Sequence, residues 1–295
     1  MKNIKQKFVF VLLAFLSLSK LEASEQPSLE STKFVIPDSQ IIPIKDTQSN
    51  KQYALYIKLP ATYKDNKDRH YPVIYFTDAL WHIELLSAAT YFMMEDVILV
   101  GISWQTDIKD DVKQQYGAHF SRFGDYSFQK TINPKHPKIQ YGQAKNHLSF
   151  IRKDVFSYVE AHYRTQTDNR SYLGFSSGGL FGLYALMTHP ETFKNYILGS
   201  PSIWRHGTAL FDLEHETLRG KKPKINLFVT YGDLEKELAP TIEHFVNTFK
   251  NKQYSLVSSI SLTTIESAGH SDSFPEMGVR GVKWLSSLPI KETKK

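Results

Sequence analysis

A Gly-Phe-Ser-Ser-Gly sequence at residues 174–178 joins a short apolar run to a helix-like stretch, and it constrains the fold more than any other feature. Ser171–Phe175 predicts a strand and Ser177–Thr188 predicts a helix, so the chain must reverse sharply at Ser176. Such a turn strains the backbone of its central serine and lifts the hydroxyl above the sheet. The pattern also occurs by chance in Gly/Ser-rich turns, but the flanking strand and helix favour a nucleophilic serine at this position.

Strand-like and helix-like segments alternate along most of the remaining chain. The apolar runs Tyr71–Thr77 and Val97–Ser103 are typical of strands buried on both faces. Alternating β and α elements imply an α/β fold with a mostly parallel sheet and helices on both faces. Two earlier strands, Gln40–Lys45 and Gln52–Leu59, predict an antiparallel N-terminal edge. Further predicted strands are Asn195–Gly199, Ile225–Tyr231 and Ser258–Ile265, and further predicted helices are Trp81–Met94, Asn146–Tyr163, Leu238–Lys250 and Phe274–Leu285.

The N-terminus has the pattern of a secretory signal peptide. Lysines at positions 2, 5 and 7 precede the apolar run Phe8–Leu18, whose 11 residues are too few to cross a bilayer as a helix. Cleavage after Ala23 would remove residues 1–23. Leu21, at the third position before this cleavage site, departs from the small residue that signal peptides usually have there. An uncleaved membrane anchor is the alternative. The pattern predicts an exported bacterial protein, periplasmic or secreted, with no stable membrane insertion of the mature chain.

The chain after the signal peptide predicts one domain. Residues 24–39 are polar and irregular and predict a linker, and residues 40–290 predict a single α/β domain. Within it, residues 105–145 have no clear period and contain several glycines and prolines. Structureless stretches of this length are uncommon in a compact domain and often functional, so a loop or lid insertion is expected here.

The composition excludes several kinds of chemistry and partner. The chain contains no cysteine, so disulfides, a thiol nucleophile and cysteine metal sites are impossible. The net charge is +6, and removing residues 1–23 takes away four lysines and one glutamate, which leaves +3. The basic residues are scattered rather than clustered, so no nucleic-acid partner is expected. Neither a metal nor a cofactor is predicted.

A serine hydroxyl is a weak nucleophile at neutral pH and needs a general base. In α/β-hydrolases the catalytic residues follow the chain order serine, acid, histidine. His270 comes directly after the last predicted strand, where this fold presents its base. The acid should follow the strand Ile225–Tyr231, where both Asp233 and Glu235 stand. The residues alone do not choose between them, and either could be a solvated carboxylate at a helix start.

Several further motifs resemble the esterase D and enterochelin-esterase-like branch of the α/β-hydrolases. The resemblance covers roughly residues 35–290 and includes the serine motif with a following helix that ends in His-Pro. It therefore implies the α/β-hydrolase fold and the hydrolysis of esters. The other matching motifs are Tyr75–Asp78, Arg122–Asp125, Ser200–Trp204, Gly232–Glu235 and His270–Pro275.

The resemblance assigns a role to each member of a catalytic triad. It implies that Ser176 is the nucleophile and His270 the general base. Glu235 is preferred as the acid because it stands three residues after Gly232, where relatives carry their acid. Phe175 stands where relatives usually have a histidine, a departure that removes no catalytic group.

The resemblance also implies residues that surround the triad. The backbone N–H groups of Leu80 and Ser177 would form the oxyanion hole. Trp204 and Arg122 are the candidates for substrate binding. Arg205 and Lys145 depart from the pattern of relatives and leave the substrate open.

The predicted function is the hydrolysis of a small-molecule carboxylic ester through an acyl-enzyme. One substrate class of the branch is the lactone backbone of catecholate siderophores, whose ferric complexes are polyanionic. Basic and aromatic residues of the 105–145 segment would suit such a ligand, but they could equally form a solvated basic loop. The alternatives are acyl transfer by the same triad and an inactive binding protein on this scaffold. The basic residues concerned are Lys113, Arg122, Lys130, Lys135 and Lys138.

Overall fold

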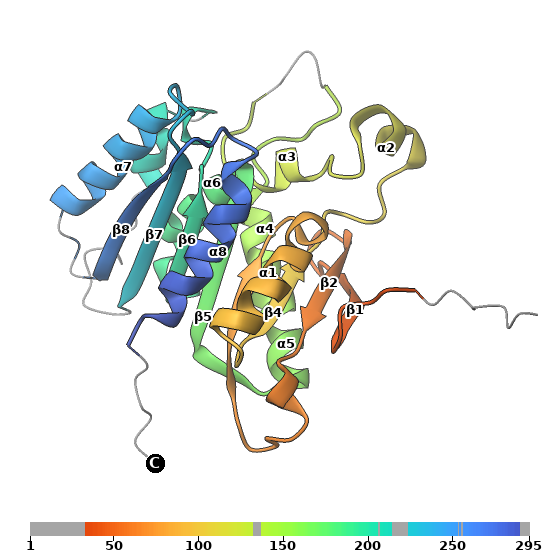
Figure 1. Cartoon of the computed structure of the whole chain (residues 1–295). Helices are drawn as coiled ribbons and strands as arrows, with labels where there is room; N and C mark the ends of the chain where they lie inside the picture. Colours follow the sequence, from red (N-terminus) through yellow and green to blue (C-terminus); the bar gives the residue numbers. More distant parts are fainter. Residues whose placement is uncertain are drawn as a thin grey trace, which may run out of the picture. The chain divides into compact units, whose positions relative to one another are not determined.

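Eight strands of the described chain form one sheet in the order β1-β2-β4-β3-β5-β6-β7-β8 (Figure 1). The computed structural model describes residues 33–131, 137–205, 207–213, 224–252, 254 and 256–289. β2 pairs antiparallel with β1 and with β4, and all other neighbouring strands are parallel. The predicted mostly parallel sheet with an antiparallel N-terminal edge is therefore confirmed. The strands are β1 (Ser39–Lys45), β2 (Gln52–Lys58), β3 (Tyr71–Phe76), β4 (Ile98–Ile102), β5 (Thr165–Phe175), β6 (Asn195–Gly199), β7 (Ile225–Gly232) and β8 (Val257–Ile265).

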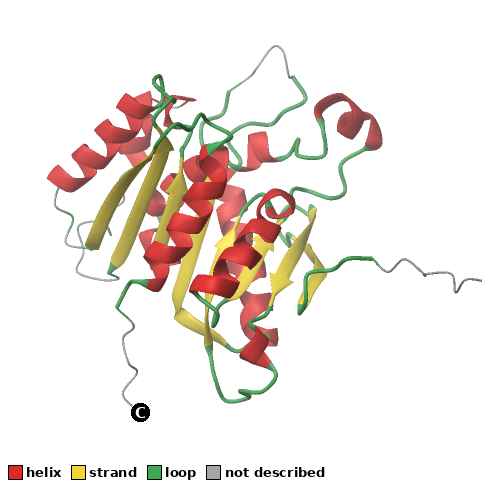
Figure 2. Cartoon of the chain, viewed as in Figure 1, coloured by secondary structure: helices red, strands yellow, loops and turns green. Residues whose placement is uncertain are grey.

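Helices cover both faces of the sheet (Figure 2). On one face α1 and α8 lie side by side, and their Leu86 and Met277 are fully buried in one apolar cluster. On the other face a larger cluster includes Phe181 of α6 and Phe245 of α7. The helices are α1 (Ala79–Met93), α2 (Asp110–Tyr116), α3 (Arg122–Asp125), α4 (Ala144–Phe150), α5 (Phe156–His162), α6 (Ser177–Thr188), α7 (Ala239–Asn251) and α8 (Ser273–Ser286).

The burial of the strands follows from this layering. Every residue of β4 is buried, as expected for a parallel strand that is covered on both faces. In β2, buried and half-buried residues alternate, because one face of this strand is less completely covered. The apolar runs seen in the sequence therefore mark the strands in the middle of the sheet.

Most predicted bounds agree with the observed ones within two residues, but two elements differ more clearly. β5 begins at Thr165, six residues before the predicted start, because exposed polar residues such as Asp168 in its first half carry no apolar signal. The predicted helix Asn146–Tyr163 is made of α4, a π-helical segment at Ile151–Val155, and α5. The hydrogen-bond pattern changes from α to π and back, but the three segments are continuous. The spacing of apolar residues does not reveal such a change.

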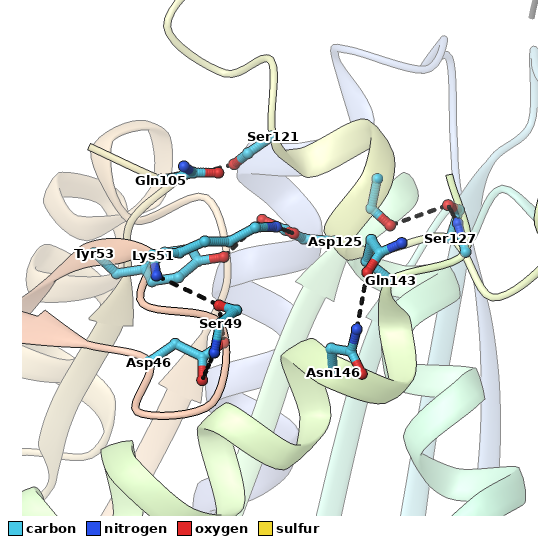
Figure 3. Close-up of polar contacts among 12 residues, drawn as sticks. Asp46, Ser49, Lys51, Tyr53, Gln105, Ser121, Asp125, Ser127, Gln143 and Asn146 are labelled. Atoms are coloured by element: carbon cyan, nitrogen blue, oxygen red, sulfur yellow. Dashed lines mark hydrogen bonds and ion pairs between the residues drawn. The ribbon is translucent and has the colours of Figure 1, made fainter. Parts of the chain in front are cut away.

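The 105–145 segment contains two short helices, α2 and α3, which are too short to produce a recognisable period. Hydrogen bonds fix its described part to the rest of the domain (Figure 3). The Asp125 carboxylate accepts from the Tyr53 hydroxyl and from Lys51 Nζ, each at 3.1 Å. Within the segment, the Ser121 hydroxyl accepts the N–H of Gln105 at 3.0 Å. The segment is therefore tied to the antiparallel edge of the sheet, which gives it a defined position.

The predicted signal peptide, residues 1–23, lies outside the described residues and stays a prediction. The predicted linker, residues 24–39, is described only from Lys33 onward, and β1 already begins at Ser39. From Val35 onward the described residues form one compact unit. A search of the described ranges finds no helix that is long and apolar enough to span a bilayer.

The buried core of β7 provides a test of this packing. Leu227 is fully buried, so we expect Leu227→Ala to lower the free energy of unfolding by about 2–5 kcal/mol through lost contacts and a residual cavity. Val279→Ala in α8 is the matched control, because Val279 is 39% exposed and should change stability by about 0.5 kcal/mol or less. Urea denaturation measures both variants. Equal effects of the two substitutions would contradict the assigned packing.

Candidate active site

Ser176 lies at a strained turn between β5 and α6. Its backbone angles are φ 58° and ψ −117°, a conformation that non-glycine residues rarely adopt. Its N–H donates to the carbonyl of Gly199 at 2.9 Å, which holds the turn against β6. A Cβ atom at Gly174 would lie 2.4 Å from the carbonyl oxygen of Gly178, so the first glycine of the motif is required by close backbone packing. The local sequence thus forms the predicted sharp turn.

Loops from three strand ends bring the predicted triad together. Ser176 follows β5, Glu235 follows β7 and His270 follows β8. His270 Nε2 lies 2.8 Å from Ser176 Oγ, and His270 Nδ1 lies 2.5 Å from Glu235 Oε1. The three side chains therefore form one continuous chain of hydrogen bonds.

The surroundings of Glu235 favour its ionised form. Its Oε2 accepts from the Ser200 hydroxyl at 2.6 Å and from the Gly232 N–H at 2.7 Å. Burial raises the pKa of Glu235, but the hydrogen bonds from His270, Ser200 and the Gly232 N–H outweigh burial and lower the pKa below its ordinary value. An ionised carboxylate can only accept, so the proton between Glu235 and His270 lies on Nδ1. His270 Nε2 is then free to accept the Ser176 hydroxyl proton.

Asp233, the other candidate acid, has a different partner. Its Oδ1 accepts the N–H of Ala268 at 3.2 Å, which connects the loop after β7 to the loop after β8. These two loops approach closely, because a Cβ atom at Gly232 would lie 2.2 Å from the Ala268 carbonyl oxygen. The geometry therefore pairs His270 with Glu235, and Asp233 helps to hold the loop that carries His270.

The two predicted oxyanion residues stand at helix starts. Ser177 is the first residue of α6 and Leu80 is the second residue of α1. The N–H groups of a first helical turn have no acceptor within their own helix, and the helix dipole makes them suited to an anion. A Cβ atom at Gly178 would lie 2.5 Å from Thr77 Oγ1, so the segment before α1 packs directly against the start of α6. The assignment of these N–H groups to an oxyanion stays a prediction.

A cavity of about 590 Å³ opens beside Ser177. One side of it is formed by the 105–145 segment and the other by Leu180 of α6 and Trp204 in the loop after β6. Trp204 lines the cavity and is 61% exposed, and its role in substrate binding stays a prediction. The aromatic residues that line the cavity are Tyr116, Phe123, Tyr126, Tyr141 and Trp204.

Arg122, the second substrate-binding candidate, also lines the cavity, but its guanidinium has a protein partner. Its Nε and Nη2 donate to the two carboxylate oxygens of Asp78 at 2.9 and 3.0 Å. Two lysines of the segment pair with acids of α2: Lys113 with Asp110 at 3.7 Å and Lys138 with Asp111 at 3.6 Å. Neither lysine lines the cavity. Lys135 lies outside the described residues.

Sequence reasoning missed two groups that shape the site. Ser200, fully buried, orients the acid, and its place in the Ser-Pro-Ser motif at 200–202 was the only available signal. Asp78 was noted only as a strand end, although its carboxylate is fully buried and binds Arg122 and Trp104. The contacts of Ser200 with Glu235 and of Asp78 with Arg122 join residues far apart in the chain, so no sequence pattern predicts them. Among the described residues, no cluster of three or more His, Asp or Glu side chains could hold a metal ion.

Comparison with protein families matches residues 47–284 to the Esterase family, described as "Putative esterase". The chain belongs to this esterase family. Ferri-bacillibactin esterase BesA of Bacillus subtilis is 27% identical over 224 residues, which cover 70% of this chain and 74% of BesA. A siderophore triacetylfusarinine C esterase of Aspergillus fumigatus is 34% identical over 103 residues, which cover 33% of this chain and 35% of that protein.

Solved structures confirm the fold. The crystal structure of BES protein from Bacillus cereus gives a TM-score of 0.75 at 20% identity and covers 89% of this chain and 100% of its own. The enterobactin and salmochelin hydrolase IroE gives a TM-score of 0.60 at 17% identity and covers 86% of this chain and 98% of its own. These structures therefore support the predicted α/β-hydrolase fold, and the similarity to BesA agrees with the esterase branch that the motifs resemble.

The two carboxylates after β7 provide a test of the site. We expect Glu235→Gln to lower kcat/KM by up to about 10⁴, because the amide lacks the charge that stabilises protonated His270 and can favour the wrong tautomer. Asp233→Asn is the matched control and should cost less than about tenfold, since Asp233 holds only a backbone N–H. The measurement is kcat/KM on one aryl ester, with the melting temperature as a control for folding. A larger loss in Asp233→Asn would reverse the assignment.

Proposed function

We propose that this esterase is a serine carboxylic-ester hydrolase that acts through an acyl-enzyme on Ser176. The observation that carries the proposal is the continuous hydrogen-bond chain from Ser176 through His270 to Glu235, with distances of 2.8 and 2.5 Å. A serine activated in this way can attack an ester carbonyl at neutral pH. Membership of the esterase family agrees with this chemistry.

The geometry supports a two-step reaction. Ser176 Oγ attacks the carbonyl carbon while His270 Nε2 takes its proton, and the N–H groups of Leu80 and Ser177 stabilise the negative oxygen. The protonated His270 then gives its proton to the departing alkoxide, which leaves as the alcohol. A water molecule attacks the acyl-enzyme in the same way, with His270 as base, and releases the acid. Glu235 keeps the imidazole oriented and stabilises its positive charge in both steps.

A siderophore ester is the substrate class that we propose. Three curated relatives have names that specify siderophore esters: BesA, the triacetylfusarinine C esterase and the siderophore enterobactin esterase of Emericella nidulans. The aromatic cavity of about 590 Å³ supports this class, since aromatic side chains pack well against catechol rings. The signal-like N-terminus supports action outside the cytoplasm, in the periplasm or the medium.

A fluorophosphonate probe tests the nucleophile and separates a hydrolase from an inactive binding protein. We expect the wild type to be labelled covalently at Ser176, and Ser176→Ala to lose both labelling and ester turnover by several orders of magnitude. Ser202→Ala is the matched control, because Ser202 Oγ lies 3.3 Å from Ser176 Oγ, while the two ring nitrogens of His270 bond to Ser176 and Glu235. It should keep its labelling. A Ser176→Ala variant within about tenfold of wild type would exclude Ser176 as the nucleophile.

A substrate panel tests the proposed class. We expect kcat/KM for an iron-free tri-catechol lactone to exceed that for short-chain aryl esters and feruloyl esters by at least about tenfold, since three catechol rings can contact more of the aromatic lining than one acyl group. Product analysis by mass spectrometry separates hydrolysis from acyl transfer to an added alcohol. A preference for short aryl esters would indicate a general esterase.

A further inference from the structure

Asp78 stands two residues before the predicted oxyanion residue Leu80. It has a left-handed backbone, with φ 57° and ψ 44°, at the start of α1. This conformation is uncommon for residues other than glycine, although aspartate adopts it more readily than most. The carbonyl of Asp78 accepts the N–H of Trp81 at 2.9 Å, so this turn determines the direction in which the Leu80 N–H points.

The side chain of Asp78 is held from three directions. It is fully buried and receives two bonds from Arg122, at 2.9 and 3.0 Å, and one from Trp104 Nε1 at 2.6 Å. The Tyr126 hydroxyl lies 3.4 Å from the same carboxylate. Burial acts to raise the pKa of Asp78, but the Arg122 guanidinium outweighs it and keeps the pKa below its ordinary value. The carboxylate is therefore ionised and rigidly placed.

The Arg122 guanidinium donates two hydrogen bonds to Asp78, and Arg122 is only 8% exposed. Its guanidinium lies 5.3 Å from the centre of the Trp81 ring and 5.6 Å from that of Tyr126, so aromatic groups enclose the ion pair. A guanidinium paired in this two-bond geometry presents little net charge to a ligand in the cavity. Its position fits a structural task at the reaction centre better than the capture of an anionic substrate.

We propose that Arg122 is a positioning residue, which fixes the turn at Asp78 through their two-bond ion pair and thereby places the Leu80 N–H for the oxyanion. The proposal rests on the proposed function, because an oxyanion forms only if an ester or a similar group is attacked. Arg122 both lines the cavity and bonds to Asp78, so it links the cavity wall to the turn before Leu80. The effect of Arg122 should therefore fall on the chemical step and not on the binding of charged substrates.

The test uses Arg122→Lys, which keeps the charge but lacks the planar two-bond geometry. The kinetics are measured on two aryl esters of equal size, one neutral and one with a carboxylate on its acyl ring. We expect kcat to fall about 10- to 100-fold on both esters, in line with a misplaced oxyanion donor, while KM changes less than about threefold. The control is Arg170→Lys, because Arg170 also donates two hydrogen bonds to a carboxylate, both to Oε1 of Glu160, and does not line the cavity; it should leave kcat within about twofold.

A second variant covers the case in which Arg122→Lys does not fold. Trp104→Phe removes one donor to Asp78 and keeps an aromatic ring in place, so we expect a smaller loss of kcat, about 3- to 10-fold, with KM unchanged. The rate of fluorophosphonate labelling should fall in parallel in both variants, since the phosphonyl oxygen uses the same N–H donors.

The outcomes separate the proposal from its alternatives. A higher KM for the anionic ester alone, with kcat intact, would show that Arg122 binds substrate charge and would overturn the proposal. Unchanged kcat in Arg122→Lys, or in Trp104→Phe if the first variant is unfolded, would overturn it as well. A wild type that neither hydrolyses esters nor reacts with the fluorophosphonate would instead refute the proposed function. That result is obtained before any variant is compared.

Discussion

The sharp reversal of the chain at Ser176 is the constraint on which the rest of the site depends. A serine with φ 58° costs roughly 1–3 kcal/mol, and such a conformation persists only where its surroundings hold it. Here the hydrogen bond to Gly199, the close contact between Gly174 and Gly178 and the packing of Thr77 against Gly178 hold the turn together. These contacts come from β3, β5 and β6, so the central strands must be in register before the serine can be presented.

Two buried carboxylates, Glu235 and Asp78, are stabilised in different ways. Glu235 is surrounded by hydrogen-bond donors, including the histidine that it orients, so it keeps its charge for use in the reaction. Asp78 is neutralised by a full positive charge on Arg122, so its charge is used for structure. The difference follows from the partners, because a histidine can gain and lose a proton during turnover and an arginine cannot. Glu235 therefore assists proton transfer by His270, while Asp78 holds the backbone turn before Leu80 in place.

The accuracy of the sequence-based prediction depended on the kind of signal available. Fully buried strands such as Asn195–Gly199 and the helix Ser177–Thr188 were predicted with their observed bounds, because their apolar residues are continuous or glycine marks their start. The first half of β5 and the helices of the 105–145 segment were missed. Exposed polar residues, or helices of only 7 and 4 residues, leave no periodic pattern to detect. The motifs named Ser176, Glu235 and His270, but their distances could not be read from spacing.

What the sequence determined by itself was the order of the elements and the chemical identity of the reacting groups. Strand-turn-helix patterning around Gly174 and Gly178, and the places of Glu235 and His270 after strand ends, follow from local rules of backbone and side-chain chemistry. Only the tertiary structure decided which carboxylate meets His270 and what Arg122 contacts. Gly232 lets the loop after β7 pass close to Ala268, and in this arrangement Glu235 contacts His270 while Asp233 bonds to Ala268. Arg122 and Asp78 are 44 residues apart, and a contact of that kind is set by the packing of one segment on another, which no local pattern encodes.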